Sequence, residues 1–308
     1  MVKKVKATTV EFIKLLRDAL AELLKNDPLR MAGATAFFTT FALPPILVII
    51  IQTFKLILDP AKVRSQLFDG LSEIIGPEAV EQIKNVLSSL RELAETQWVL
   101  IGGFIFLLFV ATTLFRVIKN SINQIWKIRP VKKVSLLKTL RTRLKSIAVI
   151  LVAGILFVIG LVAEGFRAFI GNYIFEISPL LSFYFNSFFT YIISIGVVAV
   201  WFAILFRFLP DGRPKWKTAF AGALLTALLF TLGKLILHWL LSYSNINTIY
   251  GTSASIVLLL LFVFYSSLIL YYGAAFTKVW AIKNGYPVSP LPHAKRYRLI
   301  EASIDSPD

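Results

Sequence analysis

Few residues in this chain could do chemistry. Its 308 residues include no cysteine and only two histidines, His238 and His293. The lack of cysteine excludes disulfides, thiolate metal ligands and cysteine nucleophiles. The sequence shows no serine–histidine arrangement and no cluster of histidines and carboxylates. We therefore expect no catalytic residues, no metal site and no cofactor.

Four ionisable residues within long apolar stretches are the first candidates for a substrate path. Glu164 and Arg167 share one stretch, and Lys234 and His238 share another. Ionisable groups inside a membrane usually face a protein interior or an aqueous cavity. The alternative is a structural role. Glu164 can pair with Lys234, or with Arg167 one turn along its own helix. Lys234 can also extend towards the headgroups, and His238 can be a packing residue.

Two further features add candidates for a substrate path. Pro44 and Pro45 are adjacent in an apolar stretch, where each removes an amide donor and predicts a kink or an unwound turn. Broken helices of this kind frequently line transporter sites, although isolated kinks are also common. Tyr250 and Ser266 lie at or near polar positions of the last apolar stretch. They either line a cavity or belong to helix packing and aromatic belts.

Membrane helices must position these residues. The chain is 57% hydrophobic and 16% charged, whereas soluble domains are about 45–50% apolar and about 25% charged. A membrane helix needs about 20 mostly apolar residues. Six stretches qualify, and we predict an all-α, polytopic membrane protein with six transmembrane helices at residues 32–57, 97–118, 146–170, 180–208, 218–241 and 251–279.

The distribution of charge predicts which side each loop occupies. Six spans place both termini on one side. The segments on that side carry 26 of the 33 Lys and Arg residues, in residues 1–31, 116–145, 207–217 and 278–308. Positive charge is retained in the cytoplasm, so we expect both termini to be cytoplasmic in a bacterial inner membrane.

A strongly basic run at residues 127–145 has eight Lys or Arg and no acidic residue. Nucleic-acid binding would require aromatic stacking platforms among the charges, and Trp126 is the only aromatic residue nearby. We interpret the run as a topogenic loop that meets anionic lipid headgroups. Membrane lipids are therefore expected partners, and nucleic acid is not. The sequence does not indicate the oligomeric state.

The flanking segments complete the domain organisation. Residues 1–30 form a cytoplasmic segment in which 8–25 is an amphipathic helix that lies on the membrane or packs on other helices. The transmembrane domain covers 31–282, with a basic cytoplasmic loop at about 119–145. Its outer loop, at about 58–96, is predicted to form two amphipathic helices that cap the outer face. Residues 283–308 are expected to be a cytoplasmic tail.

Three motifs resemble the YihY/BrkB family of bacterial inner-membrane proteins. They are "RMAGATAFFTTFALPPILVI", "LFRFLPDGRPKWKTAFAGALLTALLF" and the stretch from Tyr250-Gly251 to Gly273-Ala274. The resemblance covers residues 10–285 and implies six transmembrane helices and a transport-related function. The sequence departs from the family at Ala275, where members have an acidic residue. Family members were long labelled ribonuclease BN, but a zinc-dependent ribonuclease needs a His and Asp cluster that this chain lacks.

These observations together predict a function in the membrane. We expect transport or flipping of an amphipathic, lipid-like substrate, because a broken first span, buried charges and interfacial helices occur together. A small-molecule or ion transporter and a non-transporting scaffold for envelope assembly are the alternatives. The sequence does not indicate an enzyme.

Overall fold

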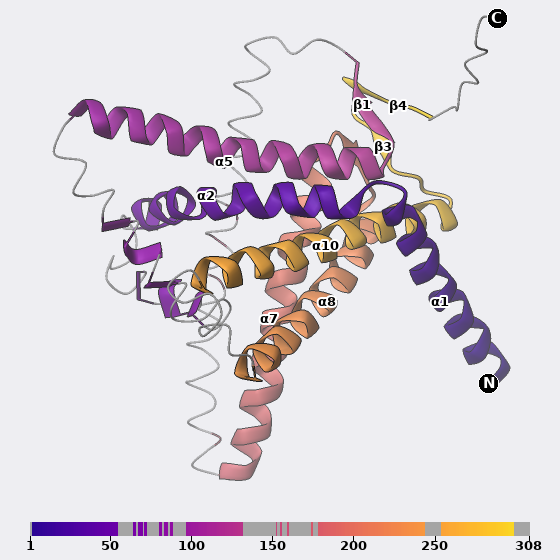
Figure 1. Cartoon of the computed structure of the whole chain (residues 1–308). Coiled ribbons are helices and arrows are strands. Elements are labelled where there is room, and N and C mark those ends of the chain that lie inside the picture. The colour runs from indigo at the N-terminus through magenta and orange to yellow at the C-terminus, as the bar shows by residue number, and fades with distance from the viewer. Residues whose placement is uncertain are drawn as a thin grey trace, which may run out of the picture.

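The computed structural model describes residues 2–54, 97–131, 178–243 and 254–298, with short pieces between 64 and 88 and residues 152, 155, 159 and 174. The described chain is mostly helical (Figure 1). The long helices are α1 (Val2–Leu24), α2 (Pro28–Phe54), α5 (Gln97–Ile125), α7 (Pro179–Phe208), α8 (Trp216–Tyr243) and α10 (Ala254–Lys283). The strands are β1 (Ile128–Pro130), β2 (Gly212–Arg213), β3 (Ser289–Pro290) and β4 (Ala294–Arg296).

Helix α10 lies at the centre of this arrangement. It contacts α2 on one side and α8 on the other, while α5 runs beside α2 and α7 runs beside α8 (Figure 1). The α2–α5 pair and the α7–α8 pair extend in different directions from the end of the molecule that carries the strands (Figure 1). Large side chains are fully buried near that end, including Phe206, Tyr271 and Ile122. The best-packed part of the core is therefore where the helices converge.

Five of the six predicted spans coincide with long helices. For example, the stretch predicted at 180–208 is α7, and the one at 218–241 is α8. Within the described residues, two helical segments are long and apolar enough to cross a membrane, Trp216–Ile236 and Ile256–Lys283. A shorter apolar segment covers Ile192–Phe208. The predicted span at 146–170 lies outside the described residues, apart from three helical positions.

The turn between α1 and α2 follows from three residues. Asn26 ends α1 by donating from Nδ2 to the Glu22 carbonyl at 2.7 Å. Asp27 adopts a left-handed backbone with φ of 52°, which aspartate tolerates better than most residues. Pro28 then opens α2, where its missing N–H is not needed. The break predicted after residue 25 is present, and it allows α1 to leave the direction of α2 (Figure 1).

The predicted outer loop at about 58–96 is partly described. Its described residues between 64 and 72 and between 80 and 88 are helical. Leu67, Val80 and Ile83 are buried in the main core cluster. Lys84 Nζ lies 5.2 Å from the centre of the Phe68 ring and links the two segments. The side of the membrane that this region occupies stays a prediction.

The C-terminal segment departs from the all-α expectation. Strand β4 pairs antiparallel with β1, and β3 pairs antiparallel with β2. We call residues 286–298 the strap, because they cross first the α7–α8 connection and then the end of α5. Tyr297 donates its backbone N–H to the Lys127 carbonyl at 3.0 Å, and Val131 donates to the His293 carbonyl at 3.0 Å. Much of the region predicted as a tail is thus a structured part of the fold.

Helices α8 and α10 approach closely at two reciprocal pairs. Gly222 of α8 faces Thr277 of α10, and Gly273 of α10 faces Thr226 of α8. A Cβ added at either glycine would collide with the threonine hydroxyl opposite. Each threonine donates that hydroxyl to its own helix, to the carbonyl of the glycine four residues earlier. Small residues allow such contact between helices in a membrane, where apolar burial gives little preference for helix over lipid.

Candidate substrate-binding site

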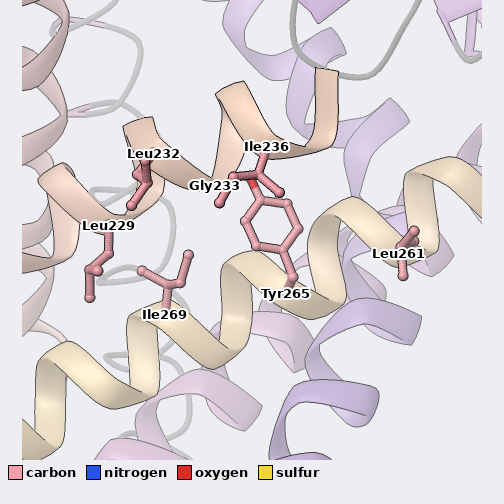
Figure 2. Close-up of a pocket in the computed structure, with 7 residues that line it drawn as sticks. All are labelled: Leu229, Leu232, Gly233, Ile236, Leu261, Tyr265 and Ile269. Carbon is pink, nitrogen blue, oxygen red and sulfur yellow. The ribbon is translucent and has the colours of Figure 1, made fainter. Parts of the chain in front are cut away.

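A pocket of about 430 Å³ lies between α8 and α10. Figure 2 shows the side chains that line it, from α8 above and from α10 below. All but one are aliphatic or glycine: Leu229, Leu232, Gly233, Ile236, Leu261, Tyr265 and Ile269. A hydrocarbon group matches this lining, because the walls offer almost no polar surface.

The positions of the glycines explain why a pocket forms here. At Gly222 and Gly273 the helix backbones nearly touch, and the pocket lies about two to four turns further along α8. There the helices are lined by larger aliphatic side chains. Gly233 lies against the ring of Tyr265, and a Cβ at this position would collide with that ring. In Figure 2 the ring extends from α10 towards Gly233 and divides Leu261 from Leu229 and Ile269.

One hydroxyl in the pocket wall, and another on the next residue of α10, lack a partner among the described residues. The hydroxyls of Tyr265 and Ser266 are both buried, and neither has a hydrogen-bond partner in the part of the chain that the structure describes. A buried hydroxyl without a partner is destabilising by about 1–3 kcal/mol. Ser266 was one of the residues predicted for a substrate path, whereas Tyr265 was not. The Tyr265 hydroxyl is the group in the pocket wall that could bind a polar group of an otherwise apolar ligand.

The predicted charges are only partly visible at this site. Lys234 is partly buried and follows Gly233 of the pocket wall directly. The structure shows no ion pair to Lys234 from any residue it describes. His238 lies in α8, but its side chain is outside the described part, and Glu164, Arg167 and Tyr250 are outside it altogether. The pairing of Glu164 with Lys234 stays a prediction.

The two prolines do not interrupt their helix. Helix α2 continues as an α-helix through Pro44 and Pro45, so the predicted unwound turn is absent, whereas the alternative, a kink, stays a prediction. Because proline has no N–H, the carbonyls of Thr40 and Phe41 lose their helical donors. Ala42, Pro44 and Leu47 are buried, which directs this part of α2 towards the protein rather than towards lipid alone. The prolines lie on α2, and no α2 residue lines the pocket between α8 and α10.

Sequence reasoning missed a buried polar cluster around Asp211. Its carboxylate, only 3% exposed, accepts from Lys119 Nζ at 2.8 Å and lies 2.9 Å from His293 Nε2. Asn123 donates to it from Nδ2 at 2.9 Å and accepts the Asp211 backbone N–H on Oδ1 at 2.8 Å. The Asp211 carbonyl accepts the backbone N–H of Leu291 at 2.8 Å. One aspartate thus ties α5, the α7–α8 connection and the strap together.

The electrostatics of this cluster favour an ionised aspartate. Burial alone raises the pKa of Asp211, but the hydrogen bonds from Lys119, His293 and Asn123, with the charge of Lys119, outweigh it, and the pKa lies below its ordinary value. With its oxygens occupied, Asp211 is a structural group rather than a free base. Among the described residues, no group of three or more histidine, cysteine or acidic side chains could hold a metal ion. The sequence signal was Asp-Gly between two prolines, which predicts a tight turn but not its partners.

A second polar contact closes the same end of the molecule. Lys278 of α10 donates from Nζ to Glu22 at 2.7 Å and to the carbonyl of Ile125 at 2.7 Å, at the C-terminus of α5. Lys127 donates to Asn26 Oδ1 at 2.9 Å. Burial lowers the pKa of Lys127 from its ordinary value, and the nearby charge of Lys278 lowers it further, partly offset by Glu22. These contacts hold α1, α5 and α10 together.

Comparisons with known proteins agree with a membrane protein. The family model described as Virulence factor BrkB matches residues 19–298. The UPF0761 membrane proteins of Pelodictyon phaeoclathratiforme and Chlorobium limicola are 26% and 25% identical to this chain, over 89% and 93% of it and 62% of each relative. A UPF0761 membrane protein of Mannheimia succiniciproducens is 24% identical over 83% of this chain and 85% of its own length.

The chain thus spans about three-fifths of the length of the first two relatives. No solved structure matches it significantly. The family match runs from the last six residues of α1 to the end of the strap and includes every other long helix in full. The chain therefore belongs to the BrkB family and is an integral membrane protein.

Proposed function

We propose that this protein moves or flips an amphipathic, lipid-like substrate across the membrane. The observation that carries the proposal is the aliphatic pocket between α8 and α10, with the unpartnered hydroxyl of Tyr265 in its wall. Its volume of about 430 Å³ falls within the range of about 300–1,000 Å³ that is typical of small-molecule sites. A hydrocarbon chain would lie against the aliphatic walls, and an ester or hydroxyl group of the same molecule would bind the Tyr265 hydroxyl.

The same pocket argues against the two alternative functions, a transporter of ions or polar solutes and a scaffold. An ion or a polar solute would need carbonyls, amides or charges along its path. The pocket wall offers one phenol hydroxyl and otherwise aliphatic groups. A scaffold has no need of an open apolar pocket or of buried hydroxyls without partners.

The proposal includes no catalytic step. It also includes the six spans, the cytoplasmic termini and the inner-membrane location expected from the charge distribution.

Reconstitution tests the proposal directly. The purified protein is placed in phosphatidylcholine and phosphatidylglycerol vesicles that contain a trace of NBD-labelled phospholipid. Dithionite bleaches the outer leaflet only, so protein-free vesicles keep about half of their fluorescence, and flipping brings the remaining label within reach. We expect a protein-dependent loss of the protected signal. If the protected half persists at every protein density and with every lipid headgroup tested, lipid flipping is refuted.

A matched pair of variants ties the activity to the pocket. Leu232 lines the pocket and is 53% exposed, whereas Leu224 is on the same helix, is 50% exposed and does not line it. Leu232→Trp fills the pocket and is expected to slow flipping several-fold. Leu224→Trp adds the same bulk elsewhere and is expected to keep the wild-type rate. Equal rates in the two variants would show that the pocket is not on the substrate path.

A further inference from the structure

Helix α1 has a wider apolar surface than its contact with α10 covers. Leu15, Ala19 and Leu23 are buried, and the first two cluster with Phe276 of α10. Ile13, Leu20 and Leu24 are also apolar but are 59%, 47% and 62% exposed. With about 3.6 residues per turn, these three lie together on one face, directly beside the buried one. We call Ile13, Leu20 and Leu24 the open face of α1.

The contacts between α1 and α10 show which way the open face points. Near the end of α10, Lys283 Nζ pairs with Glu11 at 3.0 Å and Lys278 Nζ pairs with Glu22 at 2.7 Å. About half a turn of α10 earlier, Phe276 packs against the buried face of α1. Earlier still, the Tyr272 hydroxyl donates to the Leu16 carbonyl at 3.0 Å. We call the side of α1 that carries Glu11 and Glu22 its acidic edge. From Lys283 back to Tyr272, the successive residues of α10 therefore contact the acidic edge of α1, then its buried face, and then Leu16.

The open face is the next part of α1 in this direction. At about 100° per residue, its three side chains lie about 40–80° beyond Leu16 around the helix axis. The direction from Lys283 to Tyr272 leads from the end of the apolar segment Ile256–Lys283 towards its middle. The open face thus points along α10 into the depth that lipid would occupy. The acidic edge points the opposite way and is already paired by the lysines of α10.

We infer that α1 lies in the membrane interface, with its open face among the acyl chains of the leaflet that surrounds the C-terminal end of α10. The charges bordering the open face fit this partner. Arg17 follows next around the helix, and Lys14 lies further on, past Val10 and Ala21. Both charged side chains are exposed, so they meet headgroups, including anionic ones. Glu11 and Glu22 lie on the far edge, which keeps carboxylates away from the lipid. The charge of α1 is therefore arranged for a lipid surface rather than for an acidic protein partner.

This placement differs from the stripe that the sequence suggested. The sequence alone predicts a single apolar stripe of Phe12, Leu16, Ala19, Leu20 and Leu23, which faces either the membrane or other helices. In the structure, one part of this apolar surface packs on α10, and the other part, the open face, is uncovered. The inference does not depend on substrate transport, because a scaffold or a transporter could anchor α1 in the same way.

Spin labels on the full chain test the inference. The natural chain has no cysteine, so single cysteines can be placed at Ile13, Leu20 and Lys14 and labelled with a nitroxide. All three positions are exposed, so substitution leaves the contact with α10 in place. The protein is studied in nanodiscs of phosphatidylcholine and phosphatidylglycerol. Collision with oxygen reports lipid, and collision with a water-soluble nickel chelate reports water.

We expect labels at Ile13 and Leu20 to collide several-fold more with oxygen than with the nickel chelate, and the label at Lys14 to show the reverse. Equal access of the chelate to all three sites would place the open face in water and overturn the inference. Low access of both reagents at Ile13 and Leu20, together with dipolar coupling between labels on different molecules, would also overturn it. That outcome would instead show a second copy on the open face.

Discussion

Replacing Asp211 with alanine should loosen the end of the molecule where the strap lies. The change removes the carboxylate that Lys119, Asn123 and His293 share. The partly buried Lys119 and the buried Asn123 then lose their acceptor. Breaking a buried pair typically costs about 3–5 kcal/mol. The Lys119 side chain is 19% exposed and that of His293 is 44% exposed, so solvent recovers part of the loss. We expect the free energy of unfolding to fall by about 3 kcal/mol.

Two measurements follow the change, and two variants control it. Denaturant unfolding in detergent gives the free energy, and limited trypsin digestion at Lys295 or Arg296 shows whether the strap is released before the helices unfold. Asp211→Asn keeps the shape and some hydrogen bonds, so about 1–2 kcal/mol is expected. Glu11→Ala breaks an exposed pair with Lys283 and should change stability by at most about 1 kcal/mol.

The reasoning about the cluster would be refuted by one result in particular. If Asp211→Ala unfolds like the wild type and trypsin cuts the strap no faster, the carboxylate does not hold these segments together. Early cleavage with unchanged unfolding of the helices would limit the role of Asp211 to the strap.

Three further predictions concern packing, acid and the predicted charge pair. Gly222→Ala should destabilise by about 1–3 kcal/mol in denaturant unfolding, because its methyl group meets Thr277, and adding Thr277→Ala should recover most of the loss. The folded pKa of Asp211 lies below the ordinary 3.8, so its stabilisation is complete above the unfolded pKa and is lost as the pH falls through the folded one. Below about pH 4 the digestion uses an acid-active protease in place of trypsin. We expect acid to release the strap of the wild type, whereas the strap of Asp211→Asn should show no added sensitivity to acid. Glu164→Gln and Lys234→Met should each harm stability in the same unfolding assay, and the double variant should recover it if the two side chains are paired; no recovery would argue against the pair.

The long helices could be predicted because their signal is local. An apolar run of about 20 residues sets a helix in a membrane whatever its neighbours are, and α7 and α8 begin and end within two residues of the predicted limits. The break at Asn26 to Pro28 was predictable for the same reason, since proline and its neighbours act on the chain nearby.

The pocket and the cluster could not be predicted, because they depend on residues distant in the sequence. Leu229, Leu232 and Ile269 have the same composition as any lipid-facing residues, and hydropathy does not show which of them line a pocket. Asp211 meets Asn123 and His293 across 88 and 82 residues. A turn with Asp-Gly predicts a bend but not a buried charge. Strands of two or three residues likewise have no sequence period that could reveal them.

The strap also sets the order of two steps in the synthesis of this protein, the formation of the helices and the closure of the end where the strap lies. Translation produces residues 286–298 only after every described helix, yet these residues supply His293 to Asp211 and pair with both β1 and β2. A growing chain that has just completed α10 therefore holds the end of α5 and the α7–α8 connection without their final partners. Insertion of the helices and closure of this end are separate events in time. A chain cut short after Lys283 would carry all the described helices and still expose an unfinished end to proteases.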